Sequence, residues 1–317
     1  MPRSDDDHWD LASSVGVMAT MVATARAIVT RSEDPLVNDP FAEPLVRAVG
    51  IDVFTRLASG DLLTKDLDGD EAGGMRWIAD NMAIRTKYYD DYFLDATGTG
   101  IKQAVILAAG LDSRPYRLAW PSGTTVFEID QPEVIEFKTQ TLDALGATPS
   151  ADRRAVGTDL RFDWPTALRD SGFDPQVPTV WSAEALLGYL QPEAQDQLLV
   201  TVTELSAPGS RIATETRTNF NAPTHDANSA NHSQVIERMQ RMAERWREHG
   251  FDFNLRELVY FSERSAEDFL AGLGWKLSGT TINELFVANG LPPLPEGSSF
   301  SSLRYINGEL HRRTTGD

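Results

Sequence analysis

The sequence contains no cysteine among its 317 residues. Disulfides, thiolate nucleophiles and zinc sites with cysteine ligands are therefore excluded, and a reducing cytoplasm is the expected location. Basic residues are also scarce, with 29 Lys and Arg against 47 Asp and Glu, for a formal net charge of -18. This charge repels phosphate backbones and anionic lipid head groups, so we expect no nucleic-acid partner.

Long apolar runs are missing as well. No segment approaches the roughly 20 apolar residues of a transmembrane helix. The first ten residues carry four aspartates, whereas an export signal begins with basic residues before an apolar core. The histidines are scattered, and there is neither a paired-histidine motif nor a Gly-x-Ser-x-Gly elbow, so we expect no bound metal and no serine nucleophile. They are His8, His225, His232, His249 and His311.

From residue 101 onward, short apolar runs alternate with longer amphipathic segments, which is typical of strand-helix units around a mostly parallel sheet. Right-handed crossovers between such strands produce a doubly wound α/β fold. The predicted strands are 103–109, 124–130, 154–158, 179–183, 210–215, 275–279 and 300–310, the last one antiparallel. The predicted helices in this part are 112–119, 132–145, 164–170, 192–206 and 266–272.

The N-terminal part has a different texture, with helical apolar periodicity over 13–30 and 77–94. We therefore predict a helical cap over 1–100 and an α/β domain over 101–317, together forming one structural domain. Residues 217–250 interrupt the alternation with a polar stretch and then a charged helix over 231–249. An insertion after a sheet strand lies at the rim where ligands bind, so a helical lid is one interpretation and a solvated excursion is the other.

Acidic residues recur where the predicted strands end. The first strand ends in Ala-Ala-Gly, and small side chains there let a ligand approach the backbone. Asp130 ends the second strand twenty residues after Gly110, where an acid commonly accepts hydrogen bonds from ribose hydroxyls. A tight turn with an unrelated acid is the alternative. Asp159 and Glu184 follow the third and fourth strands; helix capping is an alternative for Asp159, but glutamate is not a preferred cap.

The charge of the first turn decides which nucleoside cofactor fits. Residues 108–113 read Ala-Ala-Gly-Leu-Asp-Ser, whereas a dinucleotide needs Gly-x-Gly-x-x-Gly and a free helix N-terminus for its pyrophosphate. Asp112 would face those phosphates, at a cost on the order of several kcal/mol in a partly desolvated cleft. S-adenosylmethionine has a ribose and a sulfonium cation and no phosphate. The acidic edge therefore predicts S-adenosylmethionine, with S-adenosylhomocysteine as the product.

Four segments carry a resemblance to a known family. They read LAAGLDSR at 107–114, FEID at 127–130, DLR at 159–161 and EALLGYL at 184–190. In order and spacing they resemble the leucine carboxyl methyltransferase-like branch of the class I methyltransferases. More closely, the chain resembles the S-adenosylmethionine-dependent methyltransferases abundant in mycobacteria and other actinobacteria. The resemblance extends from the N-terminal helix to Trp275 and implies a seven-stranded Rossmann-like methyltransferase fold.

The resemblance also implies roles at the cofactor. Asp130 would hold the ribose, and Asp159 together with the Leu160 backbone would hold the adenine. Glu184 would lie beside the methionine end of the cofactor. Arg85, which matches an arginine in the helix before the first strand, would pair with the cofactor carboxylate. For Arg85 the alternative is an ion pair with Asp90 or Asp91.

The first turn departs from the family in one position. The family often has Gly-x-Gly there, and Ala108 stands in place of the first glycine while Gly110 keeps the second. This substitution tightens the expected pocket. Both residues remain candidates for contact with the cofactor.

The resemblance further implies methylation of a carboxylate on a small-molecule, lipid or polyketide-like acceptor. Arg161 could orient an ionised carboxylate with two parallel hydrogen bonds, and Tyr189 would add a donor. A salt bridge to Asp163 or another acid is the alternative for Arg161, and a packed aromatic for Tyr189. A phenol or alcohol acceptor would use the same cofactor site but need a base, for which His225 and His232 are candidates. A noncatalytic cofactor-binding protein and an NAD(P)-type Rossmann oxidoreductase are further alternatives.

Overall fold

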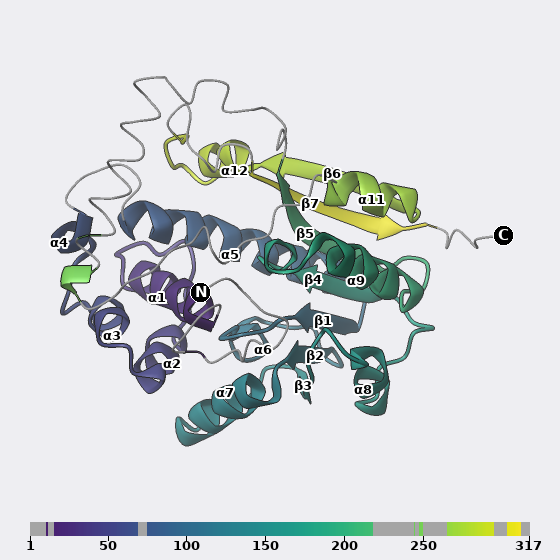
Figure 1. Cartoon of the computed structure of the whole chain (residues 1–317), viewed down its shortest axis with the longest axis horizontal. Coiled ribbons are helices and arrows are strands. Elements are labelled where there is room, and N and C mark those ends of the chain that lie inside the picture. The colour runs from purple at the N-terminus through teal and green to yellow at the C-terminus, as the bar shows by residue number, and fades with distance from the viewer. Residues whose placement is uncertain are drawn as a thin grey trace. The chain divides into compact units, whose positions relative to one another are not determined.

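The computed structural model of the chain describes Leu11 and residues 16–68, 75–217, 244, 247–249, 265–294 and 303–311 (Figure 1). The chain divides into two compact units. The first comprises Met1–Thr86 and Asn219–Leu258, and the second comprises Lys87–Thr218 and Val259–Asp317. The boundary after Thr86 falls within one helix, whereas the division at residue 100 stays a prediction.

The described part of the first unit is helical. Helix α1 packs against α2 and α3, and these two helices pack against each other. Gly50 and Gly60 follow α2 and α3 with φ of 83° and 89°, the left-handed conformation in which glycine ends a helix. The helix predicted over 13–30 is confirmed from Gly16, whereas α2 to α4 were not predicted. The helices are α1 (Gly16–Thr30), α2 (Ala42–Val49), α3 (Asp52–Ser59), α4 (Thr64–Asp68) and the first half of α5 (Met75–Gly98).

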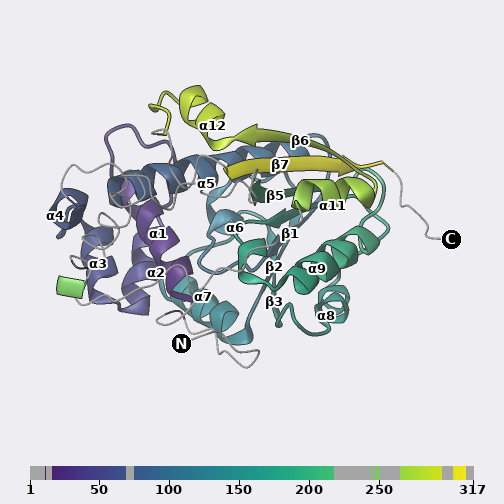
Figure 2. The ribbon, with the colours of Figure 1, turned by 45° about the horizontal axis from the view of Figure 1, so that its top comes forward.

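The second unit is built on a seven-stranded sheet with the order β3-β2-β1-β4-β5-β7-β6. The first five strands in this order are parallel, and β7 pairs antiparallel with β5 and β6 (Figure 2). The prediction of a doubly wound, mostly parallel sheet is confirmed. The strands are β1 (Gln103–Leu107), β2 (Thr125–Asp130), β3 (Asp152–Gly157), β4 (Thr179–Ala183), β5 (Arg211–Arg217), β6 (Trp275–Thr281) and β7 (Leu303–Leu310).

Helices alternate with the strands of this sheet. Four of them have a proline in the first turn, where its missing N–H costs nothing. The first predicted helix, 112–119, is shorter than expected because Asp112 lies in the turn before it and Leu118 is already extended. The helices are α6 (Arg114–Arg117), α7 (Pro132–Ala144), α8 (Trp164–Asp170), α9 (Pro192–Glu204), α11 (Ala266–Gly272), α12 (Ile282–Ala288) and the 3-10 turn η1 (Leu187–Tyr189).

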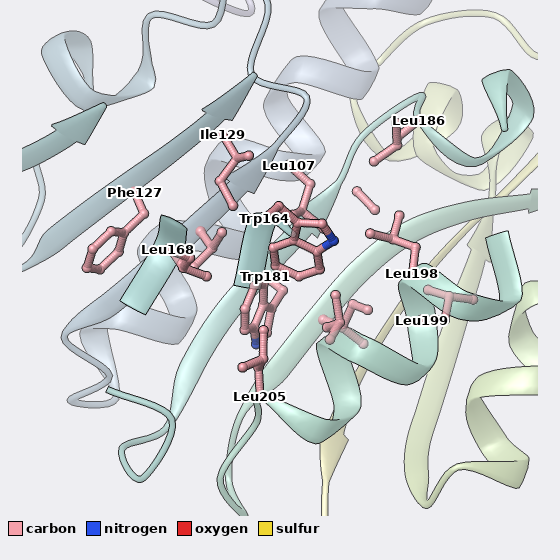
Figure 3. Packing of buried hydrophobic residues seen from close by; sticks show 14 of the residues in the cluster. Leu107, Phe127, Ile129, Trp164, Leu168, Trp181, Leu186, Leu198, Leu199 and Leu205 are labelled. Carbon is pink, nitrogen blue, oxygen red and sulfur yellow. The ribbon is translucent and has the colours of Figure 1, made fainter. Parts of the chain in front are cut away.

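The core of the second unit lies between the central strands and the helices α8, α9 and α11. All five residues of β1 and all five of β4 are buried, as expected for parallel strands covered on both faces. Trp181 of β4 is fully buried and lies beside Trp164 of α8, with ring centroids 6.5 Å apart (Figure 3). Burying a large apolar side chain stabilises the fold by about 1.5–3 kcal/mol, so this core holds the strand ends rigidly.

The predicted lid over 217–250 lies outside the described residues, apart from Arg217, Glu244 and residues 247–249. Its histidines His225 and His232 lie outside them too. Among the helices that the structure describes, none combines the length and the apolar character needed to cross a membrane.

Candidate functional site

The carboxyl ends of neighbouring parallel strands bring acidic side chains to one level of the sheet. Leu107 of β1 is paired with Ile129 of β2, so Asp130 comes one residue beyond this level. Ala183 of β4 is paired with Thr214 of β5, so Glu184 and Glu215 come one residue beyond it on those strands. The predicted acidic edge therefore contains a further carboxylate. Glu215 was missed, although an acid at a strand end was the signal that had identified the others.

The first turn is tied directly to the second strand. The N–H of Gly110 donates to Asp130 Oδ2 at 2.6 Å, and the N–H of Ala109 donates to the Ile129 carbonyl at 3.0 Å. Ala108 has a φ of 52°, in the left-handed region that costs a residue with a Cβ about 1–2 kcal/mol. Ala108 thus adopts the conformation that the family's glycine favours. Such strain persists where surrounding contacts determine the backbone, and it clusters at functional sites.

Asp130 is held by two backbone donors. Its Oδ1 accepts from the N–H of Gln131 at 2.7 Å, while its Oδ2 accepts from Gly110. Burial raises the pKa of Asp130, and the two backbone hydrogen bonds oppose this effect only in part. Each carboxylate oxygen has two lone pairs, so both oxygens can also accept from hydroxyl groups.

Asp159 and Arg161 form an ion pair with each other. Arg161 Nη2 lies 2.6 Å from Asp159 Oδ2, and its Nε lies 2.9 Å from the same atom. Burial raises the pKa of Asp159, but hydrogen bonds from Arg161 and Gln131 outweigh it and lower the pKa overall. The salt-bridge alternative for Arg161 is thus realised with Asp159, whereas Asp163 caps α8 by accepting from the N–H of Thr166.

The other predicted contacts are placed by separate elements. Leu160 packs against the core cluster, next to Asp159 in the chain. Tyr189 lies in η1, partly buried, with its N–H donating to the Leu186 carbonyl at 2.9 Å. Arg85 lies on α5 within the first unit, partly buried. The structure therefore brings Gly110 to Asp130 but does not relate Arg85 to the acidic edge.

A buried arginine joins three carboxylates in the second unit. Arg114 Nε lies 2.6 Å from Asp90 Oδ1, and Arg114 Nη1 lies 2.5 Å from Asp112 Oδ2 and 2.8 Å from Glu184 Oε2. Its side chain is only 3% exposed. Arg117 contacts both oxygens of Asp90, at 2.6 and 2.7 Å. Sequence reasoning missed Arg114, although it stands in the segment LAAGLDSR that carried the family resemblance.

The residue that follows Glu184 is also constrained. Ala185 has a φ of 48°, and its N–H donates to Glu215 Oε2 at 2.8 Å. Nearby, Tyr89 is fully buried, and its pKa lies well above the ordinary value because of burial and the carboxylates Glu215 and Glu184. Tyr89 therefore stays neutral beside these acids.

A second buried ion cluster supports the first turn. Lys138 of α7 donates from Nζ to Glu128 Oε1 at 2.7 Å and to the Asp112 carbonyl at 3.1 Å. Both charged side chains are fully buried. Arg153 of β3 binds the other oxygen of Glu128 at 2.5 Å. Among the described residues, no group of three His, Asp or Glu side chains is arranged to hold a metal ion.

The sequence of the chain matches the model of a known protein family. The family model for leucine carboxyl methyltransferase matches residues 19–203, which is more than half of the chain and includes Asp130, Asp159 and Glu184. This chain belongs to the leucine carboxyl methyltransferase family. The resemblance found in the sequence is thereby confirmed, and the family belongs to the class I S-adenosylmethionine-dependent methyltransferases.

Relatives in the family are similar over nearly their whole length. A protein of Mycobacterium avium is 60% identical over 301 residues, covering 93% of this chain and 94% of its own. A protein of Mycobacterium bovis BCG is 57% identical over 313 residues, covering 98% of this chain and 88% of its own. Both carry the name "Putative S-adenosyl-L-methionine-dependent methyltransferase".

A solved structure of a Thermobifida fusca protein overlaps with 96% of this chain and 97% of its own, at 15% identity and a TM-score of 0.49. The family assignment rests on the family model and the mycobacterial relatives rather than on this overlap.

Proposed function

We propose that this leucine carboxyl methyltransferase family member binds S-adenosylmethionine at the carboxyl ends of β1, β2 and β4 and methylates an oxygen of a small acceptor. The observation that carries this proposal is the hydrogen bond from the Gly110 N–H to Asp130 Oδ2 at 2.6 Å. It ties the small-residue turn to the acid that would accept hydrogen bonds from the ribose hydroxyls. S-adenosylhomocysteine would be the product.

The adenosine half of the cofactor would contact β2 and the loop after β3. Asp130 would accept from the ribose hydroxyls while the backbone N–H groups of Gly110 and Gln131 fix its orientation. Asp159 and the Leu160 backbone would hold the adenine, in keeping with the family match. Ala108 and Gly110 would line the turn, with small side chains that let the cofactor approach the backbone.

The methionine half would contact the acids nearer to β4. Glu184 would face the ammonium or the sulfonium, whereas the pairing of Arg85 with the carboxylate stays a prediction from the family resemblance. A pyrophosphate would meet Asp112 in the first turn. Arg114 does not reverse this charge, because it is shared by Asp90, Asp112 and Glu184.

When bound, S-adenosylmethionine supplies a methyl group on a positively charged sulfur. It would supply this methyl group to the acceptor oxygen, with the electron pair of the broken carbon-sulfur bond remaining on sulfur. The chain's own task is to hold the acceptor oxygen in line, about 3 Å from the methyl carbon, and to exclude water.

The first candidate acceptor is a carboxylate, which a cationic side chain would orient. A carboxylate acceptor arrives ionised and needs no base. Arg161 and Tyr189 would orient it, Arg161 through its guanidinium fork and Tyr189 through its hydroxyl. Arg161 already binds Asp159 through Nε and Nη2, so this role requires Asp159 and the acceptor to share one guanidinium.

That pairing favours a second candidate, a phenol or alcohol acceptor. A hydroxyl must lose its proton during transfer, so it needs a base close to the cofactor. Glu215 is a candidate base for two reasons. It follows Thr214 of β5 as Glu184 follows Ala183 of β4, and these two strand residues are paired. Its carboxylate is also oriented by the Ala185 N–H. In this case Arg161 would serve only to hold Asp159.

A ligand screen followed by product analysis tests both levels of the proposal. S-adenosylhomocysteine at about 100 times its Kd should stabilise the fold by about 2.7 kcal/mol, which raises Tm by roughly 5 °C, while NAD and NADP should not. Stabilisation by NAD or NADP alone would overturn the assignment.

The protein is then incubated with labelled S-adenosylmethionine and host extract, and mass spectrometry identifies the methylated product. A labelled methyl ester that mild alkali hydrolyses indicates a carboxylate acceptor, and an alkali-stable methyl ether indicates a hydroxyl. Cofactor binding without any labelled product would instead support a noncatalytic binding protein.

A further inference from the structure

Arg114 connects three segments that the sequence keeps far apart. Its partner Asp90 lies 24 residues before it on α5, and its partner Glu184 lies 70 residues after it beyond β4. Asp112, its third partner, lies in the first turn. All of these contacts fall within the second compact unit. One guanidinium therefore fixes the first turn, a helix and the end of β4 relative to one another.

Two of the three partners of Arg114 make further contacts. Asp112 Oδ1 accepts from the Arg114 N–H at 2.7 Å, and the Asp112 carbonyl accepts from Lys138 Nζ. Asp90 accepts from both terminal nitrogens of Arg117. These contacts leave little freedom for the guanidinium, so the position of Glu184 relative to the first turn depends on the arginine.

The charge of this group also matters. Burial disfavours a charged guanidinium, but the three carboxylates outweigh this effect and hold the pKa of Arg114 well above its ordinary value. Arg114 therefore stays charged at every working pH. The acids Asp90, Asp112 and Glu184 against Arg114 and Arg117 give a formal sum of one negative charge. A group with this sum accommodates a cation better than an anion.

We propose that Arg114 is a positioning residue that presents the Glu184 carboxylate to the ammonium of the cofactor's methionine end. This inference rests on the proposed function, because it needs the cofactor at this edge. It predicts that Arg114 determines affinity for ligands that carry the amino-acid end, and that it has little influence on ligands that consist of adenosine and a thioether alone.

Two ligands separate this role from a general loss of structure. S-adenosylhomocysteine carries the ammonium and carboxylate, whereas 5'-methylthioadenosine has the same adenosine and thioether without them. Arg114→Lys keeps a positive charge but loses the planar fork, so it cannot bind Asp90 from one nitrogen and Asp112 and Glu184 from another. Calorimetry should show a rise of about tenfold or more in the Kd for S-adenosylhomocysteine, with the Kd for 5'-methylthioadenosine within about twofold.

A double-mutant cycle tests whether the effect passes through Glu184. In a Glu184→Gln background, Arg114→Lys should change the Kd for S-adenosylhomocysteine by less than about threefold. Arg211→Lys is the matched control, because Arg211 binds Asp95 from the start of β5, at the opposite end of that strand from Glu215, and its ratio of the two Kd values should equal that of the parent. Should Arg114→Lys fail to fold, Asp112→Asn removes one anchor of the guanidinium and should shift the ratio in the same direction by a smaller factor.

An unchanged ratio in both Arg114→Lys and Asp112→Asn would overturn the inference, as would an equal loss of both ligands. It would also be overturned if Arg114→Lys raised the Kd for S-adenosylhomocysteine by the same factor in the Glu184→Gln background as in the parent. If the parent protein binds neither ligand, the proposed cofactor itself is wrong. The parent measurement thus distinguishes the two failures.

Discussion

Asp130→Asn tests the centre of the proposed cofactor site. In the parent, Asp130 Oδ2 accepts from the Gly110 N–H and Oδ1 from the Gln131 N–H, at 2.6 and 2.7 Å. An asparagine keeps one carbonyl oxygen and replaces the other with an NH2 group, which cannot accept. Asparagine is preferable to alanine here, because it preserves the shape of the side chain and leaves one backbone hydrogen bond in place.

The effect on the empty protein is a difference of two opposing contributions. One backbone N–H loses its acceptor, which costs about 1–3 kcal/mol. Against this, burial raises the pKa of Asp130, so the ionised carboxylate is itself penalised in the folded state at neutral pH. Asparagine removes that penalty. We therefore expect the free energy of unfolding of the variant to lie within about 2 kcal/mol of that of the parent.

The effect on the ligand has no such compensation. A hydrogen bond from a ribose hydroxyl to an ionised carboxylate contributes about 1.5–3 kcal/mol, and asparagine can keep at most a neutral one. A loss of about 2–3 kcal/mol raises the Kd roughly 30- to 150-fold. Because the ribose is common to both ligands, the Kd values for S-adenosylhomocysteine and 5'-methylthioadenosine should rise by similar factors.

Calorimetry with both ligands, alongside urea unfolding, makes the measurement. Asp163→Asn is the matched control, since Asp163 also accepts from a backbone N–H but caps α8 and is not among the proposed cofactor contacts. Its ligand affinities should equal those of the parent. A folded Asp130→Asn variant with parental affinity for both ligands would refute the ribose assignment.

Three further outcomes are expected. Lys138→Met leaves Glu128 buried with one cation fewer, so urea unfolding should show a loss of about 3–5 kcal/mol, and a loss below about 1 kcal/mol would contradict the buried-pair account. Arg161→Ala should lower turnover of a carboxylate acceptor by a larger factor than it lowers cofactor affinity in calorimetry, where only the loss of its ion pair with Asp159 acts, and equal turnover would remove Arg161 from the acceptor site. Because the pKa of Asp159 is lowered in the fold, its ionised form adds stability that is lost as pH falls below 3.8, so the stability gap between parent and Arg161→Ala should close in acid. A gap that stays constant between neutral pH and acid would exclude this linkage.

The elements with strong local signals were predictable from the sequence. The strand over 179–183 and the helices over 164–170 and 266–272 match β4, α8 and α11 residue for residue. A short apolar run bounded by turn residues, or a proline in the first turn, is sufficient for such segments. Helix α12 was missed although Thr281 and Glu284 form a capping box, because a capping box is a weak signal without a long apolar stripe behind it.

Part of the candidate site was predictable for a geometric reason. Parallel strands end at the same edge, so acids that follow consecutive strands are brought near one another whatever the length of the helices between them. Asp130 and Glu184 were identified in this way. Glu215 obeys the same rule but was not singled out, although like Asp130 it is the last residue of a predicted strand; the observed strand continues to Arg217.

The pairing of charges was not predictable, because it depends on distances between distant segments. Arg161 had several acids within reach along the chain, and only the folded loop after β3 shows that Asp159 is its partner. Asp90 was named with Asp91 as an alternative partner for Arg85, and the structure shows that it binds Arg114 and Arg117. A long guanidinium side chain selects its partner from whatever the fold places within a few ångströms, and charge composition carries no such information.

The sequence by itself determined the order of the strands and of most helices around the sheet, the acidic residues at the strand ends and the family to which the chain belongs. These properties follow from local periodicity and from residue types at strand ends, which the chain carries before it folds. Only the tertiary structure decided that Arg114 is buried among three carboxylates and that Lys138 binds the carbonyl of Asp112 in the first turn. Such contacts arise because burial removes water as a partner, so each charged group must bind the opposite charge that packing brings to it.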